Sequence, residues 1–131
     1  MNTFLIALTT AAKAASVPPL MLIAMCFNET GLQNVINVND GGSASYGICQ
    51  VKFKTAKMLS RAVKPSQLMQ PQINANLAAM YLKYQLTRYE HKFCSVNAYN
   101  RGHTASCTAN IDTAYVRKVK HFMLTKPWRN R

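Results

Sequence analysis

Apolar residues recur at helical spacing from the start of the chain. In the opening segment, five of them fall three or four positions apart or side by side: Phe4, Leu5, Leu8, Ala12 and Ala15. This spacing predicts a helix with one apolar face. The longest apolar run here is short and no basic residues precede it, so we interpret the segment as the first helix of the folded domain rather than as a secretion signal.

The next segment is apolar on almost every side of a helix. Pro18 and Pro19 end the first helix and begin a second, because proline is accommodated in the first helical turn. Residues 20–27 are all apolar, which predicts a buried helix, and Gly31 is suited to ending it. Glu29 is therefore predicted in the last turn of a buried helix.

The rest of the chain is predicted to form short helices joined by loops. Residues 32–47 are rich in Asn, Asp, Gly and Ser, which favour turns, so at most a short, irregular hairpin is expected there. Further helical segments are predicted from about Lys54 to Ser60, at Pro65 as a single turn, from Pro71 onward, over 94–100 before Gly102, and over about 111–124. The pattern predicts an all-α protein with six or seven short helices.

The helix that follows Pro71 carries an apolar stripe. Its members share one helix face: Ile73, Leu77, Met80, Tyr81 and Tyr84. We predict that this stripe packs into the core rather than lining a ligand site, because apolar residues at helical spacing usually face the core.

Length and composition exclude several classes of protein. A chain of 131 residues is the size of one domain, so a single domain over residues 1–131 is expected. Intrinsic disorder is excluded because 49% of the residues are hydrophobic. The sequence has no uncharged apolar run of the roughly 18 residues that a transmembrane helix needs.

The charge is strongly one-sided. Sixteen Lys and Arg residues face four acidic residues, which gives a formal net charge of +12. Such a domain should seek polyanions, among them nucleic acid, anionic lipid and the bacterial cell envelope, although any single cluster could simply be a solvated face. Any carboxylate chemistry must use one of the four acids: Glu29, Asp40, Glu90 or Asp112.

Four cysteines are present, and none of them forms a C-x-x-C pair. A zinc ribbon or a thioredoxin-like redox motif is therefore not expected, and no metal or cofactor is predicted. Cys94 and Cys107 flank one short segment and form the most plausible disulfide pair. Reduced, buried thiols are an equally open alternative for all four cysteines.

Glu29 is the residue most able to carry chemistry. A carboxyl group that follows an apolar helix should be partly desolvated, and desolvation raises the pKa of an acid. A carboxylic acid that is still protonated near neutral pH can donate a proton to a leaving group, as glycosidases do at a sugar–sugar bond. On this pattern alone, an exposed or lysine-paired glutamate is the more common case.

The loop after Glu29 favours sugar chemistry. Residues 40–52 contain three glycines, Gly41, Gly42 and Gly47, together with two serines and Gln50. Glycine lets a backbone approach a ligand closely, and hydroxyl, amide and free backbone groups are what a sugar-binding site needs. Taken alone, the loop could equally be a plain turn.

Several motifs together resemble the soluble lytic transglycosylase domain, which shares its fold with goose-type lysozyme. The resemblance runs in order from about residue 17 to residue 116. Its parts are the helix at residues 19–25, Glu29-Thr30-Gly31, Ser45-Tyr46-Gly47-Ile48-Cys49-Gln50-Val51, Thr55-Ala56, Asn76-Leu77-Ala78-Ala79-Met80-Tyr81-Leu82, Ala98-Tyr99-Asn100-Arg101-Gly102 and Asp112-Thr113-Ala114-Tyr115-Val116. The resemblance implies a lysozyme-like fold whose helices surround a saccharide groove.

The resemblance also implies a reaction. Glu29 would protonate the glycosidic oxygen between N-acetylmuramic acid and N-acetylglucosamine in peptidoglycan, then accept the proton of the muramoyl C6 hydroxyl as a 1,6-anhydro ring closes. The substrate-binding residues that it implies are Ser45, Gly47, Ile48, Gln50, Tyr81, Tyr99 and Asn100. A bridge between Cys26 and Cys49, tying the catalytic helix to the groove loop, is a further hypothesis.

Asp40 leaves a second reaction open. An inverting hydrolase needs a second carboxylate about 6.5–9.5 Å from the acid to activate water. If Asp40 occupied that place, the protein would be a hydrolytic muramidase. If Asp40 only caps a turn, the transglycosylase interpretation stands, and we favour this one.

The expected partners are the glycan strands of peptidoglycan and the anionic cell envelope. The small size is typical of a phage endolysin or virion lysin that reaches the cell wall, in the periplasm or from outside, through a holin or within a particle. A monomer is expected. A basic nucleic-acid-binding helical domain is a remote alternative, because no helix-turn-helix or interleaved basic and aromatic pattern is present.

Overall fold

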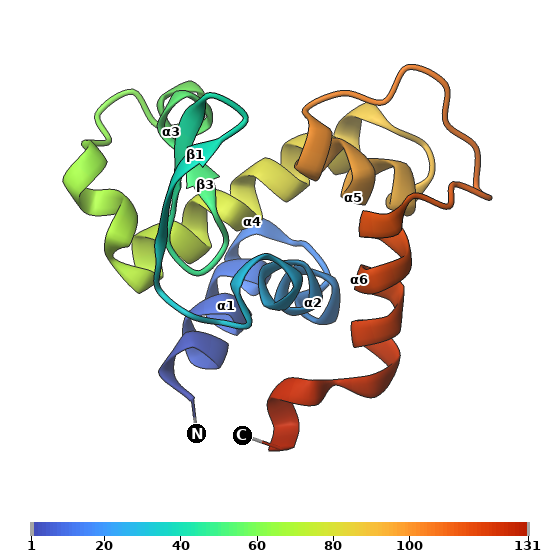
Figure 1. Ribbon diagram of the computed structural model, residues 1–131, viewed down its shortest axis with the longest axis horizontal. Helices are drawn as coiled ribbons and strands as arrows, with labels where there is room; N and C mark the ends of the chain where they lie inside the picture. The colour runs from blue at the N-terminus through green and yellow to red at the C-terminus, as the bar shows by residue number, and fades with distance from the viewer. Residues whose placement is uncertain (1, 131) are drawn as a thin grey trace.

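The computed structural model describes residues 2–130 and is built mainly of helices (Figure 1). The elements in chain order are α1 (Thr3–Ala15), α2 (Pro19–Thr30), β1 (Ile36–Asp40), β2 (Ser43–Tyr46), β3 (Val51–Lys52), α3 (Phe53–Leu59), the 3-10 helix η1 (Pro65–Met69), α4 (Pro71–Arg88), α5 (Lys92–Arg101), α6 (Ala114–Thr125) and the 3-10 helix η2 (Pro127–Asn130). The predicted fold class, a mainly helical lysozyme-like fold, is confirmed.

The long helix α4 crosses the molecule and forms its centre, with α1 and α2 on one side and α5 against its C-terminal half (Figure 1). The apolar face predicted for the first helix is real, since Leu8 and Ala12 are fully buried against the core. The opening segment is therefore an integral part of the hydrophobic core.

Helix α2 is deeply buried, as the sequence predicted. Its residues Met21–Cys26 are all buried, as expected for a segment that is apolar on every side. Pro19 occupies the first turn, and Gly31 ends the helix with a φ of 65°, in the left-handed region that favours glycine. Glu29 consequently lies in the last turn, where the sequence placed it.

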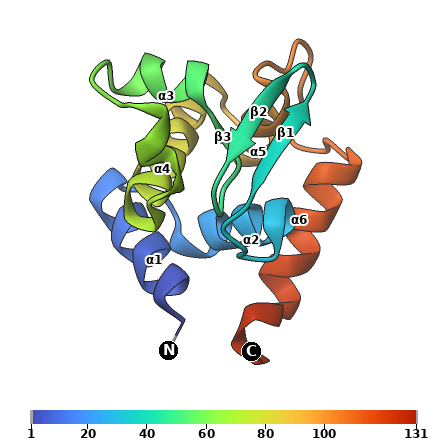
Figure 2. The same ribbon diagram turned by 60° about the vertical axis from the view of Figure 1, so that its left-hand side comes forward.

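A small antiparallel sheet stands above α2 in the order β1-β2-β3 (Figure 2). The β1–β2 pair is the short, irregular hairpin that was predicted, because its register shifts between Asn37 and Asp40. The third strand, β3, pairs Val51 with Tyr46 and extends the hairpin beyond the predicted loop. The sheet carries Asp40 to the side of the pocket that also contains Glu29.

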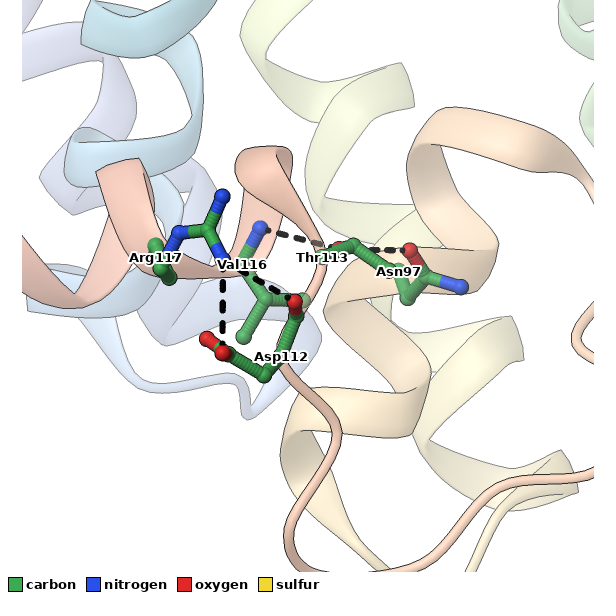
Figure 3. A network of polar contacts seen from close by, with 5 residues as sticks. All are labelled: Asn97, Asp112, Thr113, Val116 and Arg117. Carbon is green, nitrogen blue, oxygen red and sulfur yellow. Dashed lines mark hydrogen bonds and ion pairs between the residues drawn. The ribbon is translucent and has the colours of Figure 1, made fainter.

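Helix α6 begins about three residues later than predicted, at Ala114. The hydroxyl of Thr113 accepts a hydrogen bond from the backbone N–H of Val116 (3.2 Å) and donates one to Asn97 Oδ1 on α5 (3.0 Å; Figure 3). Asp112 lies outside the helix, where its exposed carboxylate pairs with Arg117 (3.3 Å). Thr113 thus starts α6 and anchors it to α5.

Two disulfides are present among the described residues. One joins Cys94 on α5 to Cys107 in the loop that follows, the pair that the sequence favoured. The other joins Cys26 on α2 to Cys49 in the turn between β2 and β3, the bridge that was offered as a hypothesis from the sequence. No helix within residues 2–130 is long and apolar enough to span a lipid bilayer.

The apolar stripe predicted on α4 is only partly in the core. Leu77 is buried, but Met80 and Tyr84 are each 39% exposed. The prediction was wrong for these two residues because α4 has open surface along this face, where Met80 and Tyr84 line two separate pockets. Tyr84 returns below as part of a surface pocket.

Candidate active site

A pocket of about 200 Å³ lies between α2, the hairpin, α3, α4 and the end of α5. We call it the acid pocket, because it contains two of the four acidic residues of the chain. Six of the predicted site residues line it: Glu29, Asp40, Gln50, Tyr81, Tyr99 and Asn100. The fold therefore brings together residues that lie up to 71 positions apart in sequence.

The carboxyl group of Glu29 is partly buried and accepts a hydrogen bond from the hydroxyl of Tyr115 (2.9 Å to Oε2). Burial raises the pKa of Glu29 from 4.5 to about 7. The hydrogen bond from Tyr115 opposes this rise in pKa, and the negative charge of Asp40 adds slightly to it. At neutral pH a large share of Glu29 is thus a neutral acid, able to give up a proton.

Tyr115 was missed as a site residue. It lies on α6, 86 residues after Glu29, and burial raises its own pKa well above the ordinary value, so it remains a hydrogen-bond donor. The sequence does contain a signal for it, because Tyr115 belongs to the same short motif as Asp112. Asp112 is on the surface and takes no part in the pocket.

The turn formed by residues 47–50, whose Gln50 lines the acid pocket, is held in place by side chains from the surrounding helices. Asn74, fully buried on α4, donates hydrogen bonds to the carbonyl oxygens of Tyr46 (2.8 Å) and Leu68 (2.9 Å) and accepts one from the N–H of Cys49 (3.0 Å). Gly47 has a φ of 79°, and a Cβ there would lie 2.4 Å from Asn74 Nδ2. Glycine is therefore required at this position.

Three further contacts tie the same turn to the helices around it. Thr30, next to Glu29, donates a hydrogen bond to the carbonyl of Ile48 (2.8 Å), and the buried hydroxyl of Tyr99 donates one to the carbonyl of Cys49 (3.2 Å). The disulfide from Cys26 adds a covalent link to α2. The position of the turn relative to Glu29 is thereby fixed by side chains from α2, α4 and α5.

Three predicted site residues do not line the acid pocket. Ser45 and Ile48 are fully buried, and neither they nor Gly47 line the pocket. Ser45 and Ile48 pack onto the core, and a role for these three residues in binding substrate stays a prediction. Ser45 instead donates a hydrogen bond to Asp40 Oδ2 (2.6 Å).

The remaining predicted residues form the opposite wall and the rim. Tyr81 packs against Tyr99 with ring centroids 5.1 Å apart, and Asn100 is exposed beside them. The side-chain amide of Gln50 donates to the carbonyl of Gly47 (3.0 Å), which leaves its Oε1 free of any hydrogen bond within residues 2–130. These groups offer aromatic faces and amides to a sugar.

Five lining residues were not predicted as ligands: Val51, Lys52, Thr55, Arg101 and Gly102. The ammonium group of Lys52 donates to the backbone carbonyl of Asp40 (2.5 Å) and holds the end of the hairpin in place. No group of three or more His, Cys, Asp or Glu side chains within the described part of the chain could hold a metal ion. The carboxyl groups that line the pocket are those of Glu29 and Asp40.

Comparison with known proteins identifies the family. The family model of the transglycosylase SLT domain matches residues 7–122. The chain belongs to this family. The matched range contains every residue that lines the acid pocket, as well as Tyr115 and Asn74.

Two relatives of this SLT domain are informative. Protein IpgF of Shigella flexneri is 28% identical over 95 residues, which cover 70% of this chain, and the chain spans only 62% of that protein's length. Lytic transglycosylase Slt of Pseudomonas aeruginosa, solved as an inactive mutant with one glutamate changed to glutamine, superposes with a TM-score of 0.75 at 19% identity. That match covers 95% of this chain and 24% of the larger one, and it shows a common fold.

Proposed function

We propose that this SLT domain is a lytic transglycosylase that cleaves the bond between N-acetylmuramic acid and N-acetylglucosamine in peptidoglycan. The observation that carries the proposal is a glutamic acid with a pKa near 7, held by a tyrosine hydroxyl in the pocket of an SLT domain. The inactivity of a glutamate-to-glutamine mutant of the Pseudomonas enzyme supports a glutamate as the essential group.

In the first step Glu29 donates its proton to the glycosidic oxygen, and the bond from that oxygen to C1 of the muramoyl sugar breaks. In the second step, the ionised Glu29 accepts the proton of the C6 hydroxyl of the same muramoyl sugar, while the oxygen of that hydroxyl forms a bond to C1. The product is a 1,6-anhydro sugar, and Glu29 ends in its starting state. No water is consumed, so one carboxyl group suffices.

The walls of the acid pocket fit the same role. A raised pKa places Glu29 where it can both release and accept a proton near neutral pH, which is the requirement for a group that acts first as acid and then as base. We propose that Gln50, Tyr99 and Asn100 hold the sugars, with Tyr81 as a supporting contact. Because Tyr99 is anchored to the turn, a sugar resting on it would be fixed relative to Glu29.

Mass spectrometry of the fragments released from purified peptidoglycan tests the proposal directly. We expect products that end in 1,6-anhydro-muramic acid and that are lighter than hydrolytic products by one water molecule. Reducing-end products would show hydrolysis instead. Absence of any sugar product from folded protein would contradict both reactions.

Hydrolysis is the second candidate, and the position of Asp40 favours it. Asp40 lines the same pocket as Glu29, and its charge contributes to the raised pKa of Glu29. Its contribution is the smallest of the three causes, and Ser45 already occupies one of its oxygens. We therefore rank Asp40 as a supporting group rather than as the base that activates water.

An Asp40→Asn variant separates the two reactions. For a transglycosylase, we expect activity to stay within a few-fold and the pKa of Glu29 to fall, because a neighbouring negative charge is removed. For a hydrolase, loss of the general base should cost about 100-fold or more. A matched Ser45→Ala variant leaves the carboxylate in place and controls for disturbance of the hairpin.

The charge of the chain suggests where the enzyme acts. A domain with a net charge of +12 should concentrate at an anionic bacterial envelope, with affinity that falls as salt rises. We propose the cell wall as its site of action.

A further inference from the structure

Cationic side chains line two adjoining pockets. A second pocket of about 680 Å³, the basic pocket, lies between α3 and the C-terminal half of α4 and shares part of its wall with the acid pocket. Its wall contains Tyr84 and the cations that give the pocket its name: Lys54, Lys57, Arg61 and Arg88. The acid pocket contains Lys52 and Arg101. Of these two cations, Lys52 is bonded to the strand that carries Asp40.

Two side chains from the neighbouring strands hold Asp40 at the end of β1 (Figure 2). The antiparallel pairing of β2 with β3 places Lys52 opposite Ser45, and residues paired in this way have their side chains on the same face of a sheet. Ser45 donates a hydrogen bond to the carboxylate of Asp40 (2.6 Å), and the ammonium of Lys52 donates one to its backbone carbonyl (2.5 Å). The carboxylate and the backbone of Asp40 are therefore held by separate donors.

Backbone pairing alone leaves this end of the hairpin weakly held. The register of β1 against β2 shifts between Asn37 and Asp40, and the turn that follows consists of Gly41 and Gly42. A turn of two glycines has much conformational freedom. A Cβ on Gly41 would lie 3.7 Å from Nζ of Lys52, so the ammonium packs against this turn. The position of Asp40 thus depends on the two side chains that hold it.

A freely moving carboxylate in this pocket would compete with ring closure. Asp40 and Glu29 line the same pocket of about 200 Å³, which is larger than a single water molecule needs. In hydrolysis, the oxygen of a water molecule bonds to C1 of the muramoyl sugar while a carboxylate takes up one proton of that water. The glycosidic oxygen leaves with the proton of Glu29, as in ring closure. The place of the second carboxylate therefore decides between the two products.

We propose that Lys52 is a positioning residue that keeps the carboxylate of Asp40 against Ser45 and so favours ring closure over hydrolysis, an inference that rests on the function proposed above. For Asp40 to turn toward C1, its hydrogen bond with Ser45 has to break and the end of β1 has to move. The bond from Lys52 to the backbone carbonyl opposes that movement. Lys52 acts through Asp40 on the choice of product.

The test measures the ratio of the two products in water labelled with heavy oxygen. Purified peptidoglycan is digested, and mass spectrometry separates labelled reducing-end products from unlabelled 1,6-anhydro products. Lys52→Met removes the hydrogen-bond donor and keeps a long side chain, whereas Lys52→Arg retains a donor. Lys83→Met removes the same charge from an exposed position on α4 outside both pockets and serves as the control.

We expect the share of labelled products to rise about tenfold in Lys52→Met, because a released general base speeds attack by water. The share should stay near the wild-type value in Lys52→Arg and Lys83→Met. Adding Asp40→Asn to Lys52→Met should abolish the rise, since no carboxylate then remains at this position to take up the proton. A contact of Lys52 with the sugar alone would change KM for both products and leave their ratio unchanged.

Three results would overturn the inference. The first is an unchanged product ratio in Lys52→Met. The second is a rise of equal size in Lys52→Arg or Lys83→Met, which would show that the donor at this position is not the cause. The third is a rise that persists when Asp40→Asn is added, which would show that water reacts without Asp40.

Failure of the proposed reaction gives a different result. Folded wild-type protein would then release no sugar products, or mainly labelled ones. Amide hydrogen exchange tests the hold on Asp40 without any reaction: residues 40–43 should exchange about tenfold faster in Lys52→Met than in wild-type protein or Lys83→Met, because one hydrogen bond is lost. Equal exchange in all three proteins would overturn the inference even where the proposed reaction is found.

Discussion

In the acid pocket, the carboxyl group of Glu29 is partly buried and accepts a hydrogen bond. In the adjoining basic pocket, the side chains of Lys54 and Arg61 are exposed and make no polar contact within residues 2–130. The acid pocket is also held by a disulfide and by hydrogen bonds from three helices. This difference separates two ways in which a protein uses charge. Reaction chemistry needs a desolvated, oriented group, while attraction of a charged ligand needs only unpaired charge at the surface.

The comparison predicts that one neutral substitution in the acid pocket outweighs two charge changes in the basic pocket. Glu29→Gln should reduce release of sugar products by about 1,000-fold, because the only proton donor of the proposed reaction is lost. Its thermal midpoint should be unchanged or higher, since a buried carboxyl becomes an amide of similar shape. Product release is followed by mass spectrometry and the midpoint by calorimetry, and retained activity would rule out Glu29 as the acid.

The two disulfides allow a sharper test of how the acid pocket is held. Replacing Cys26 and Cys49 by Ala opens a link across 23 positions, and replacing Cys94 and Cys107 opens one across 13. Each change should lower the free energy of unfolding by roughly 3 kcal/mol in the chain-entropy account. Urea unfolding measures this loss.

Activity should distinguish the same two variants. At a temperature well below both transitions, only loss of the Cys26–Cys49 link should also reduce product release, because only that bond joins the helix of Glu29 to the turn beside it. An equal loss of activity in both variants would show that general loosening, not the wall of the pocket, is responsible.

Burial of Glu29 should make stability depend on pH in a particular direction. The folded state holds this proton up to about pH 7, whereas the unfolded chain releases it near 4.5. Stability should therefore fall as the pH rises from 4.5 to 7, by about 2 kcal/mol once partial exposure is taken into account. Glu29→Gln should lose this slope, and the difference between the two proteins in urea unfolding at pH 5 and pH 8 isolates it from the other carboxyl groups.

A smaller effect than these tests the link between Tyr115 and Glu29. Tyr115→Phe removes the hydrogen bond that lowers the pKa of Glu29, so this pKa should rise further and the alkaline limb of the pH–rate profile should move to higher pH. The maximal rate should fall about tenfold, as expected for loss of one hydrogen bond to a charged group. Tyr84→Phe, outside this contact, serves as the control and should leave the alkaline limb in place.

Local patterns in the sequence determined the helices and the place of Glu29. Residues 20–27 are apolar throughout, and proline and glycine lie at the two ends of their helix. The bounds of α2, and with them the place of Glu29 in its last turn, could therefore be predicted from residues that are close in sequence. The hairpin was expected from its turn-forming residues. These features depend on backbone preferences and spacing, which are written locally.

Tertiary structure decided which side chains meet. Tyr115 reaches Glu29 only because Thr113 anchors the start of α6 to α5, and Asn74 holds the turn of residues 47–50 from a helix that is distant in sequence. The hydrogen bond from Ser45 to Asp40 likewise depends on how the hairpin packs. Helical spacing gives the face of each helix and not its neighbour, so contacts between distant elements follow only from how the whole core packs.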